Sequence, residues 1–236
     1  MRVEACPSIP SDETHVWFYC INGNESPATL SPAEQERAAR FRFPIHRSRY
    51  IAAHVWMRRT LAGYCSAHAA ELVFEQGEFG KPYLCGFPIH FNLSHSGDHA
   101  MLAVSPAPVG ADIEQVADKP DLTAIARRFF TGAESQALDS LPPERRTWGF
   151  YRLWTFKEAL LKATGEGLAG GINSVDLSRA LIHNTIAHGV WRIEALRAPN
   201  GFAAAVCHQS PHVRCFTEAA APAKPEGSDG PRDAML

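Results

Sequence analysis

Long apolar runs, a signal core, paired cysteines and a strong net charge are all missing from this 236-residue sequence. No window approaches the roughly 18 consecutive apolar residues that a membrane span needs. The first residues, MRVEACPSIPSDE, contain no apolar core, so we expect no secretion signal. A net charge of -2 gives no argument for binding to nucleic acid or to membranes. We therefore expect a cytoplasmic protein with neither kind of partner.

The six cysteines form no CxxC pair and have no metal-ligand spacing, which excludes the common zinc-binding patterns. We expect free thiols in a reducing compartment. A single catalytic cysteine stays open, although no neighbouring residue singles one out. The sequence also has no GxSxG, HExxH or Walker A motif, so the usual patterns of serine hydrolases, zinc peptidases and P-loop enzymes are absent.

The composition, 45% hydrophobic and 20% charged, is typical of a soluble globular chain with one large core or two small ones. Ser31, Pro32 and Glu34 predict a helix start, as the N-cap, the first helical residue and the capping-box partner. The first half is expected to contain a strand at 15–21, this short helix, a longer helix at 47–64 that stops at Gly63, a strand at 71–76, a strand–turn–strand unit at 91–105 and a strand at 109–114.

The second half repeats this order loosely. It is expected to contain helical structure at 122–138, a helix at 149–164 that stops at Gly165, and strands at 175–178, 190–196 and 201–208. We predict an α+β fold of two similar α/β subdomains, 1–115 and 116–217, with their sheets side by side. The tail, 218–236, is rich in Ala, Pro, Gly and charge, and we expect it to be disordered.

The stretch VGADIE (109–114) places two carboxylates in an apolar strand. Side chains alternate along a strand, so Asp112 and Glu114 point the same way. Like charges repel unless something positive lies between them, and bare carboxylates are costly to bury. The candidates are a metal ion, an Arg or Lys side chain, or water at the end of the strand. A strand end that faces solvent is the simpler explanation for the two residues taken alone.

The helix WTFKEALLK (154–162) places Glu158 and Lys162 four residues apart, on one face that is separate from its apolar stripe. Taken alone, such a pair is usually a solvated ion pair that contributes little to stability. With Asp112 and Glu114 it supplies a third carboxylate, and three carboxylates with phosphate oxygens and water are a usual way to hold Mg²⁺.

Other residues add positive charge. His95 lies in FNLSHSG (91–97) and Lys81 in a rigid Gly-Lys-Pro turn, although a structural histidine and an exposed lysine are the simpler interpretations. Seven arginines (37, 40, 42, 47, 49, 58 and 59) lie in a region with no acid between residues 36 and 71. This excess favours an anionic partner over a merely solvated helix face. Three acids, several cations and a histidine together suit a Mg²⁺–polyphosphate site.

Taken in order, GKP (80–82), FNLSHSG, VGADIE and WTFKEALLK resemble the 4′-phosphopantetheinyl transferases, specifically the larger surfactin-type class. The resemblance runs from about residue 30 to residue 207. It implies a pseudo-dimer in one chain, with two halves related by a pseudo-twofold axis and a monomeric state. It also implies that coenzyme A and an apo acyl or peptidyl carrier protein are the substrates. A carrier serine would attack the β-phosphorus of coenzyme A, take up the 4′-phosphopantetheine arm and release adenosine 3′,5′-bisphosphate, as in secondary metabolite biosynthesis or fatty acid synthesis.

The resemblance also assigns roles to single residues. Asp112, Glu114 and Glu158 would hold Mg²⁺ against the pyrophosphate, Lys162 would neutralise the leaving bisphosphate, and Glu158 is a candidate base for the serine proton. The expected coenzyme A contacts are Ser94 and His95 at phosphates, Lys81 near the adenine, Lys157 toward the nucleotide, and Arg49, or else Arg37, at the 3′-phosphate. Two other functions stay open, namely another Mg²⁺-dependent phosphotransfer or diphosphate hydrolysis, and a non-catalytic module that binds coenzyme A or a carrier protein.

Overall fold

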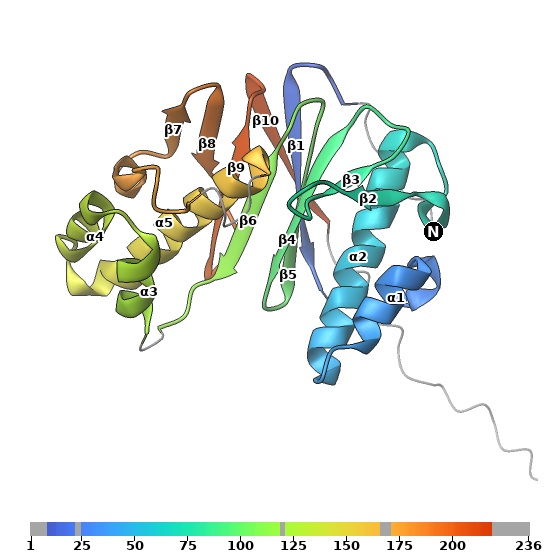
Figure 1. Ribbon diagram of the computed structural model, residues 1–236, viewed down its shortest axis with the longest axis horizontal. Coiled ribbons are helices and arrows are strands. Elements are labelled where there is room, and N and C mark those ends of the chain that lie inside the picture. The colour runs from blue at the N-terminus through green and yellow to red at the C-terminus, as the bar shows by residue number, and fades with distance from the viewer. Residues whose placement is uncertain (1–8, 22–24, 119–120, 166–170, 219–236) are drawn as a thin grey trace, which may run out of the picture.

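The computed structural model describes residues 9–21, 25–118, 121–165 and 171–218 of the chain. Figure 1 shows two halves side by side, each with a sheet and one long helix packed against it. The first half contains β1 (Glu13–Cys20), α1 (Pro32–Ala39), α2 (Pro44–Cys65), β2 (Phe74–Gln76), β3 (Pro82–Leu84), β4 (His90–Ser96) and β5 (His99–Ser105). The second half contains β6 (Gly110–Gln115), α3 (Leu122–Phe129), α4 (Gly132–Asp139), α5 (Pro143–Thr164), β7 (Thr185–His188), β8 (Trp191–Ala195), β9 (Phe202–His208) and β10 (His212–Glu218).

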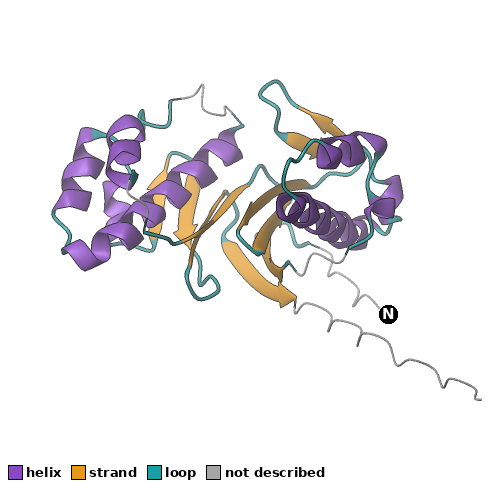
Figure 2. Cartoon of the chain, turned by 90° about the horizontal axis from the view of Figure 1, so that it is seen from below, coloured by secondary structure: helices purple, strands orange, loops and turns teal. Residues whose placement is uncertain are grey.

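The strands form two four-stranded sheets and one hairpin. The first sheet has the order β10-β1-β5-β4, the second has the order β6-β9-β8-β7, and β2 pairs with β3. All pairs are antiparallel except β1 and β10, which are parallel. Figure 2 shows the strands in the middle of the molecule and helices on both outer sides. The predicted α+β class with two similar halves is confirmed.

Strand β10 of the second half lies in the sheet of the first half. The expected division at residue 115 assigns β6 to the first subdomain, but β6 pairs with β9 in the second sheet. In turn β10, which is distant in sequence, pairs with β1 in the first sheet. The first sheet therefore takes its edge strand, β10, from the second half. Glu218, the first residue of the expected tail, belongs to β10, and 219–236 lie outside the described residues.

Side chains of β4 join the two sheets. The free edge of β6 faces β4 and would leave every second N–H group without a partner. Polar side chains at alternate positions of β4 accept these hydrogen bonds in place of a backbone ladder. The three contacts are Ala111 N to Asn92 Oδ1 (2.8 Å), Ile113 N to Ser94 Oγ (3.3 Å) and Gln115 N to Ser96 Oγ (3.0 Å).

A buried ion pair anchors α2 in the first half. Ser31 caps α1, and the side chain of Glu34 accepts the reciprocal bond from the Ser31 backbone. That carboxylate also pairs with Arg58 at 2.7 Å. Arg58 is 1% exposed and donates to two carbonyl groups of the following loop. The predicted capping box is confirmed, and one glutamate connects α1 to α2.

The second half repeats this arrangement. Thr131 and Glu134 form a capping box at α4, and Glu134 pairs with the buried Lys157 at 2.9 Å. Lys157 donates to two loop carbonyl groups, as Arg58 does. Both α2 and α5 have 22 residues and begin with proline, and both cations lie fourteen residues after that proline. This match between the halves supports the predicted pseudo-twofold relation.

The expected helical structure at 122–138 is present as two helices, α3 and α4, because Thr131 starts a new capping box. Other local predictions were wrong. Gly63 lies inside α2, which ends instead at Ser66 in a left-handed conformation, with φ of 49°. Residues 175–178 form no strand, and β7 and β10 were not predicted. Gly165, with φ of 76°, caps α5 as expected.

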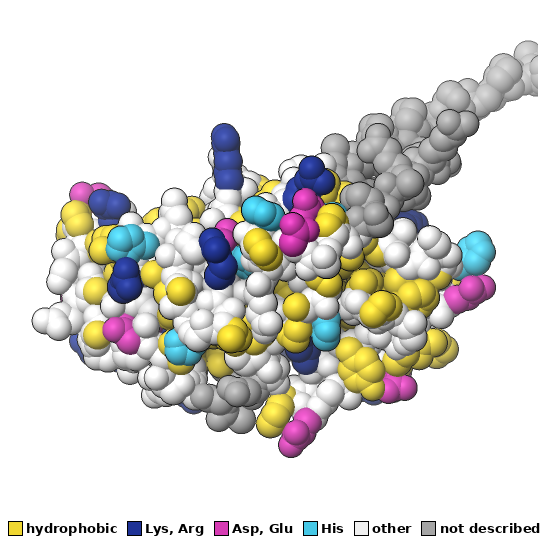
Figure 3. All heavy atoms as spheres, turned by 90° about the horizontal axis from the view of Figure 1, so that it is seen from above, with side chains coloured by type: hydrophobic (Ala, Val, Ile, Leu, Met, Phe, Trp, Pro, Cys, Tyr) yellow, Lys and Arg dark blue, Asp and Glu magenta, His cyan; other side chains and the backbone are white. Residues whose placement is uncertain are grey.

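The charge on the visible surface and the state of the cysteines point to no particular ligand. On the face shown in Figure 3, basic, acidic and apolar side chains are interspersed. The five cysteines within the described ranges are free thiols. Among the same residues, no helix combines the length and the apolar character that a membrane crossing requires.

Candidate active site

A close approach of α5 to β6 sets the geometry of the site. Gly110 lies directly under the last turns of α5. A Cβ atom at this position would lie 2.0 Å from the carbonyl oxygen of Ala159 and 2.3 Å from the nitrogen of Ala163. Only glycine leaves room for this contact. The end of α5, with its charged side chains, is thereby held against the carboxylates of β6.

Alternation along β6 separates its apolar and acidic residues. Ala111 and Ile113 are fully buried and pack in a core between the two sheets. Asp112 and Glu114 share the other face with Gly110 and point beside α5, as the sequence predicts. The strand therefore has one face in the core and its acids at the site.

Asp112 lies at the centre of a charged cluster. Its Oδ1 atom is 2.6 Å from Lys162 Nζ and accepts a hydrogen bond from Ser94 Oγ at 2.9 Å. Lys162 Nζ also donates to Ser94 Oγ at 3.2 Å. Of the alternatives for the two strand carboxylates, Lys162 is the positive partner of Asp112 in this structure. The second oxygen, Oδ2, is buried and has no hydrogen-bond partner in the described part of the chain.

Two further carboxylates lie in the same cleft. Glu114 accepts a hydrogen bond from Ser96 Oγ at 2.8 Å. Burial raises the pKa of Glu158, and the negative charge of Asp112 raises it further, against an opposing effect of Lys162. Asp112, Glu114, Glu158 and Lys162 all line one cleft of about 1450 Å³. Glu158 of α5 therefore lines the same cleft as Asp112 and Glu114 of β6.

In this structure the three carboxylates do not form a complete metal-binding site. Among the described residues, no three Asp, Glu, His or Cys side chains are grouped closely enough to hold a metal ion. The donor set nevertheless suits a hard cation, because it offers only carboxylate oxygens. Asp112 Oδ2 is a buried acceptor that has no hydrogen-bond partner among the described residues. The oxygen donors of Asp112, Glu114 and Glu158 are therefore of the type that Mg²⁺ prefers, although the three side chains are not grouped around one point.

Positive charge gathers around His95, which lines the cleft. Partial burial lowers the pKa of His95, and the charges of Lys162, Arg49 and Arg37 lower it further. Arg37 lines the cleft, and Arg49 is half-buried on α2. Both predicted arginines therefore lie close enough to act on His95. Such a concentration of cations is suited to a phosphate group.

Lys81 lies next to the site, but its ammonium group is occupied. Lys81 Nζ donates to the carbonyl oxygens of Val109 at 3.0 Å and Ala163 at 3.2 Å. Burial lowers the pKa of Lys81 to about 8. Its neighbours Gly80 and Pro82 line the main cleft. The lysine holds the β2–β3 hairpin against β6 and the end of α5, so only the rest of its turn is available to a ligand.

Lys157 is a predicted site residue that the structure places in the core of the second half, away from the cleft. It is 2% exposed, pairs with Glu134 and does not line the cleft. Adjacent residues on a helix point about 100° apart, so Lys157 faces the second core while Glu158 faces the cleft. The expectation that Lys157 points toward the nucleotide is therefore corrected.

Among the aromatic and imidazole groups of the cleft wall, sequence reasoning did not assign Tyr50, His54 or Trp154 to the site. Tyr50 and His54 stack at 3.8 Å between ring centroids, and burial lowers the pKa of His54 to about 4. Their spacing of four residues on α2 was the available signal. Trp154 stands one helical turn before Glu158, at the spacing that puts both on one side of α5.

A cleft with three carboxylates, a lysine and a cationic end is the kind of site that binds a phosphorylated ligand. Comparisons with known families agree. Residues 108–217 match the model of the 4′-phosphopantetheinyl transferase superfamily, and residues 24–107 match the model of the 4′-phosphopantetheinyl transferase N-terminal region.

Three relatives show the extent of the similarity. The 4′-phosphopantetheinyl transferase HetI of Nostoc sp. is 41% identical over 169 residues, which are 67% of this chain and 71% of HetI. The enzyme psf-1 of Bacillus pumilus is 43% identical over 61% of this chain and 62% of its own length. Sfp of Bacillus subtilis (strain 168) is 30% identical over 77% of this chain and 83% of Sfp. The chain belongs to the 4′-phosphopantetheinyl transferase superfamily, which confirms the predicted family.

Proposed function

We propose that this protein transfers the 4′-phosphopantetheine arm of coenzyme A to a serine hydroxyl of an apo acyl or peptidyl carrier protein. Membership of the transferase family supports the reaction. The observation that carries the assignment to this cleft is that Asp112, Glu158 and Lys162 line it together, although they come from a strand and a distant helix. Other phosphotransfer chemistry would use similar groups, so the acceptor must be tested directly.

Mg²⁺ would be held by Asp112, Glu114 and Glu158. The all-oxygen donor set supports this assignment, and so does the buried Asp112 Oδ2, which accepts no hydrogen bond from the part of the chain that the structure describes. When bound, the ion supplies positive charge that offsets the negative charge of the pyrophosphate. Until then, the Lys162 ammonium group neutralises Asp112 from the side of Oδ1.

Glu158 is the proposed base. In the reaction the serine oxygen forms a bond to the β-phosphorus, and the bond from that phosphorus to the bridging oxygen of the nucleotide breaks. The serine proton must leave, and a carboxylate accepts it best when its pKa lies near the working pH. Burial raises the pKa of Glu158 and the charge of Asp112 adds to this, against the lowering effect of Lys162, so the net shift is in that direction.

Lys162 is proposed to stabilise the leaving group. The departing adenosine 3′,5′-bisphosphate gains negative charge on the oxygen that loses its bond to phosphorus. The Lys162 ammonium group lies one helical turn from Glu158 and is held by Ser94 and Asp112. A cation fixed in position before the reaction stabilises developing charge without reorganisation, and the loss of one such group costs on the order of 10²–10³ in rate.

The cationic end of the cleft is proposed to bind the nucleotide. His95, with Arg49 or Arg37, would contact the 3′-phosphate, and Ser94 would contact the pyrophosphate. The turn at Lys81 would border the adenine through its backbone, since its ammonium group bonds to two carbonyl oxygens. We also propose that the enzyme acts in the cytoplasm as a monomer, because the second half supplies the α5 side chains that complete the site.

The test is to incubate the protein with coenzyme A, Mg²⁺ and a panel of apo carrier proteins, and to measure intact carrier mass. We expect an increase of about 340 Da, the formula mass of the arm, on at least one carrier. A chelator should abolish the increase, and Mg²⁺ should restore it. Release of a nucleotide product without a mass change on any carrier would instead indicate hydrolysis or another phosphotransfer. Calorimetry showing that coenzyme A binds equally with and without Mg²⁺ would favour a non-catalytic binding module.

A further inference from the structure

Exposed apolar side chains concentrate where α1 connects to α2. Phe41, Phe43 and Ile45 have 37%, 55% and 53% of their surfaces exposed. They are three of the nine large hydrophobic residues that stand exposed among the described residues, and they fall within five consecutive positions. With Arg42 and Arg47 between and after them, they are called the α1–α2 patch below. Single exposed hydrophobic residues are ordinary, but a contiguous group points to a binding surface.

The fold gives no reason for this exposure. Phe43 is the N-cap position of α2, where a polar side chain usually accepts a backbone hydrogen bond, and it makes no such bond. The first turn of α2 also has no acidic residue to balance the positive end of the helix. A short polar residue here would serve the helix better, so local stability does not explain the choice of phenylalanine.

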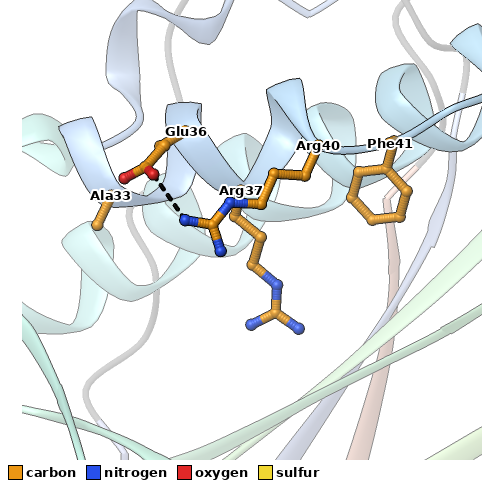
Figure 4. A pocket seen from close by; sticks show the side chains of 5 residues that line it. All are labelled: Ala33, Glu36, Arg37, Arg40 and Phe41. Carbon is orange, nitrogen blue, oxygen red and sulfur yellow. Dashed lines mark hydrogen bonds and ion pairs between the residues drawn. The ribbon is translucent and has the colours of Figure 1, made fainter.

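The positive charge of the patch is also uncompensated. Arg42 and Arg47 are exposed, and neither makes an ion pair with a carboxylate within the described part of the chain. The neighbouring Arg40 differs, because it pairs with Glu36 at 2.6 Å along α1, as Figure 4 shows. The Arg42 guanidinium lies over the Phe43 ring, 5.5 Å from its centroid. The patch therefore combines apolar surface with positive charge that no carboxylate of the described residues offsets.

The patch is continuous with the catalytic cleft. A hollow of about 540 Å³ lies beside α1. Among the side chains that line it, Arg37 extends away from the Arg40–Glu36 pair and Phe41 lies at one end (Figure 4). Arg37 and Phe41 also line the main cleft. The Phe41 ring contacts Tyr50, with 5.3 Å between centroids, and Tyr50 is part of the cleft wall. A molecule on the patch would therefore rest on the rim of the cleft.

We infer that the α1–α2 patch docks the carrier protein, an inference that rests on the proposed function. A protein substrate must bring its serine into the cleft, so the surface around that serine contacts the rim. The complement of this rim is a carrier surface with an exposed apolar side chain flanked by Asp or Glu residues close to the serine. The nucleotide sites assigned above, at Arg37 and Arg49, lie outside the residues chosen for testing.

The test compares Phe43→Ser and Arg47→Glu with two matched controls in the second half. Ile182→Ser removes a hydrophobic residue that is 78% exposed, and Arg145→Glu reverses an exposed arginine. For each patch variant we expect the KM for the apo carrier to rise about tenfold, as for loss of an interface anchor. The KM for coenzyme A and kcat at saturating carrier should stay within about twofold of wild type. The controls should match wild type throughout.

Charge reversal on the carrier provides the second arm. Replacing an acidic residue beside the carrier serine by lysine should restore transfer by Arg47→Glu and weaken transfer by the wild type. Added salt should raise the carrier KM of the wild type more than that of Arg47→Glu. If the wild type labels a carrier while Phe43→Ser, Ile45→Ser and Arg47→Glu all keep its KM, the docking assignment is wrong. If the wild type labels no carrier at all, the proposed function itself fails.

Discussion

Replacing Lys162 by methionine tests the central ion pair, because it keeps the aliphatic stem and removes the charge. The two charged atoms are 2.6 Å apart, and the side chains of Lys162 and Asp112 are 29% and 3% exposed. At an effective dielectric constant of about 20, their attraction is roughly 6 kcal/mol, and desolvation cancels most of it. Breaking a fully buried pair costs about 3–5 kcal/mol. The partial exposure of Lys162 reduces our expectation to about 2–3 kcal/mol of unfolding free energy.

Urea unfolding and thermal melting provide the assay. For a chain of this size, that loss corresponds to a melting temperature lower by roughly 4–12 °C. Arg40→Met is the matched control, because Arg40 and Glu36 are also 2.6 Å apart but 72% and 67% exposed. It should cost about 0.5 kcal/mol or less. Mg²⁺ should stabilise Lys162→Met more than the wild type, since the substitution leaves the Asp112 charge without its ammonium partner.

Two results would refute this reasoning. If Lys162→Met were as stable as Arg40→Met, the lysine would not neutralise a buried carboxylate in the native protein. If Mg²⁺ stabilised both variants and the wild type equally, the carboxylates of the cleft would not be where the ion binds. Turnover adds a separate check, because Lys162→Met should lower kcat far more than it weakens coenzyme A binding.

Three further substitutions probe other parts of the account. Gly110→Ala should lower the free energy of unfolding by about 1–3 kcal/mol or more and impair transfer, because the new Cβ would lie 2.0 Å from a backbone oxygen of α5. The control Gly132→Ala should be tolerated, because its Cβ would have nothing within 4 Å. Thermal melting and turnover measurements check both variants. Lys157→Met should cost about 3–5 kcal/mol in urea unfolding, because Glu134 loses its buried partner, yet the coenzyme A affinity of the folded protein should persist. Glu158→Gln should raise the melting temperature at neutral pH. The pKa of Glu158 is raised in the folded protein, so its ionisation destabilises the folded state as the pH rises above the ordinary value of 4.5. The glutamine avoids this loss, and the difference from wild type should vanish below pH 4.5.

The sequence predicted most where local rules decide the structure. The start of α1 is indicated within four residues by Ser31, Pro32 and Glu34, and the structure confirms it. The same capping-box pattern occurs at Thr131 and Glu134, but this helix start was missed, because the hydrophobic pattern continues across it. The left-handed end of α2 at Ser66 had no glycine to mark it, so Gly63 was taken as the stop.

Long-range pairing was beyond local rules. β10 pairs with β1 from the opposite end of the chain, and no pattern within either segment indicates this partner. The alternation of Asp112 and Glu114 gave their shared face correctly, but no local pattern brings Glu158 to them, and their grouping rested on the donor set that Mg²⁺ prefers and on the family resemblance. Lys157 shows the limit of that resemblance, since a position next to a site residue on a helix can face the core instead.

The most direct test of the central claim is the binding of Mn²⁺, a spectroscopic substitute for Mg²⁺, measured by electron paramagnetic resonance with coenzyme A present. We predict that the wild type and the control variant Glu144→Gln bind one ion with equal affinity, because Glu144 is an exposed acid at the start of α5. Asp112→Asn and Glu158→Gln should each bind it at least about tenfold more weakly, since each removes one carboxylate ligand. Unchanged affinity in both variants would contradict the claim that these carboxylates share a cation.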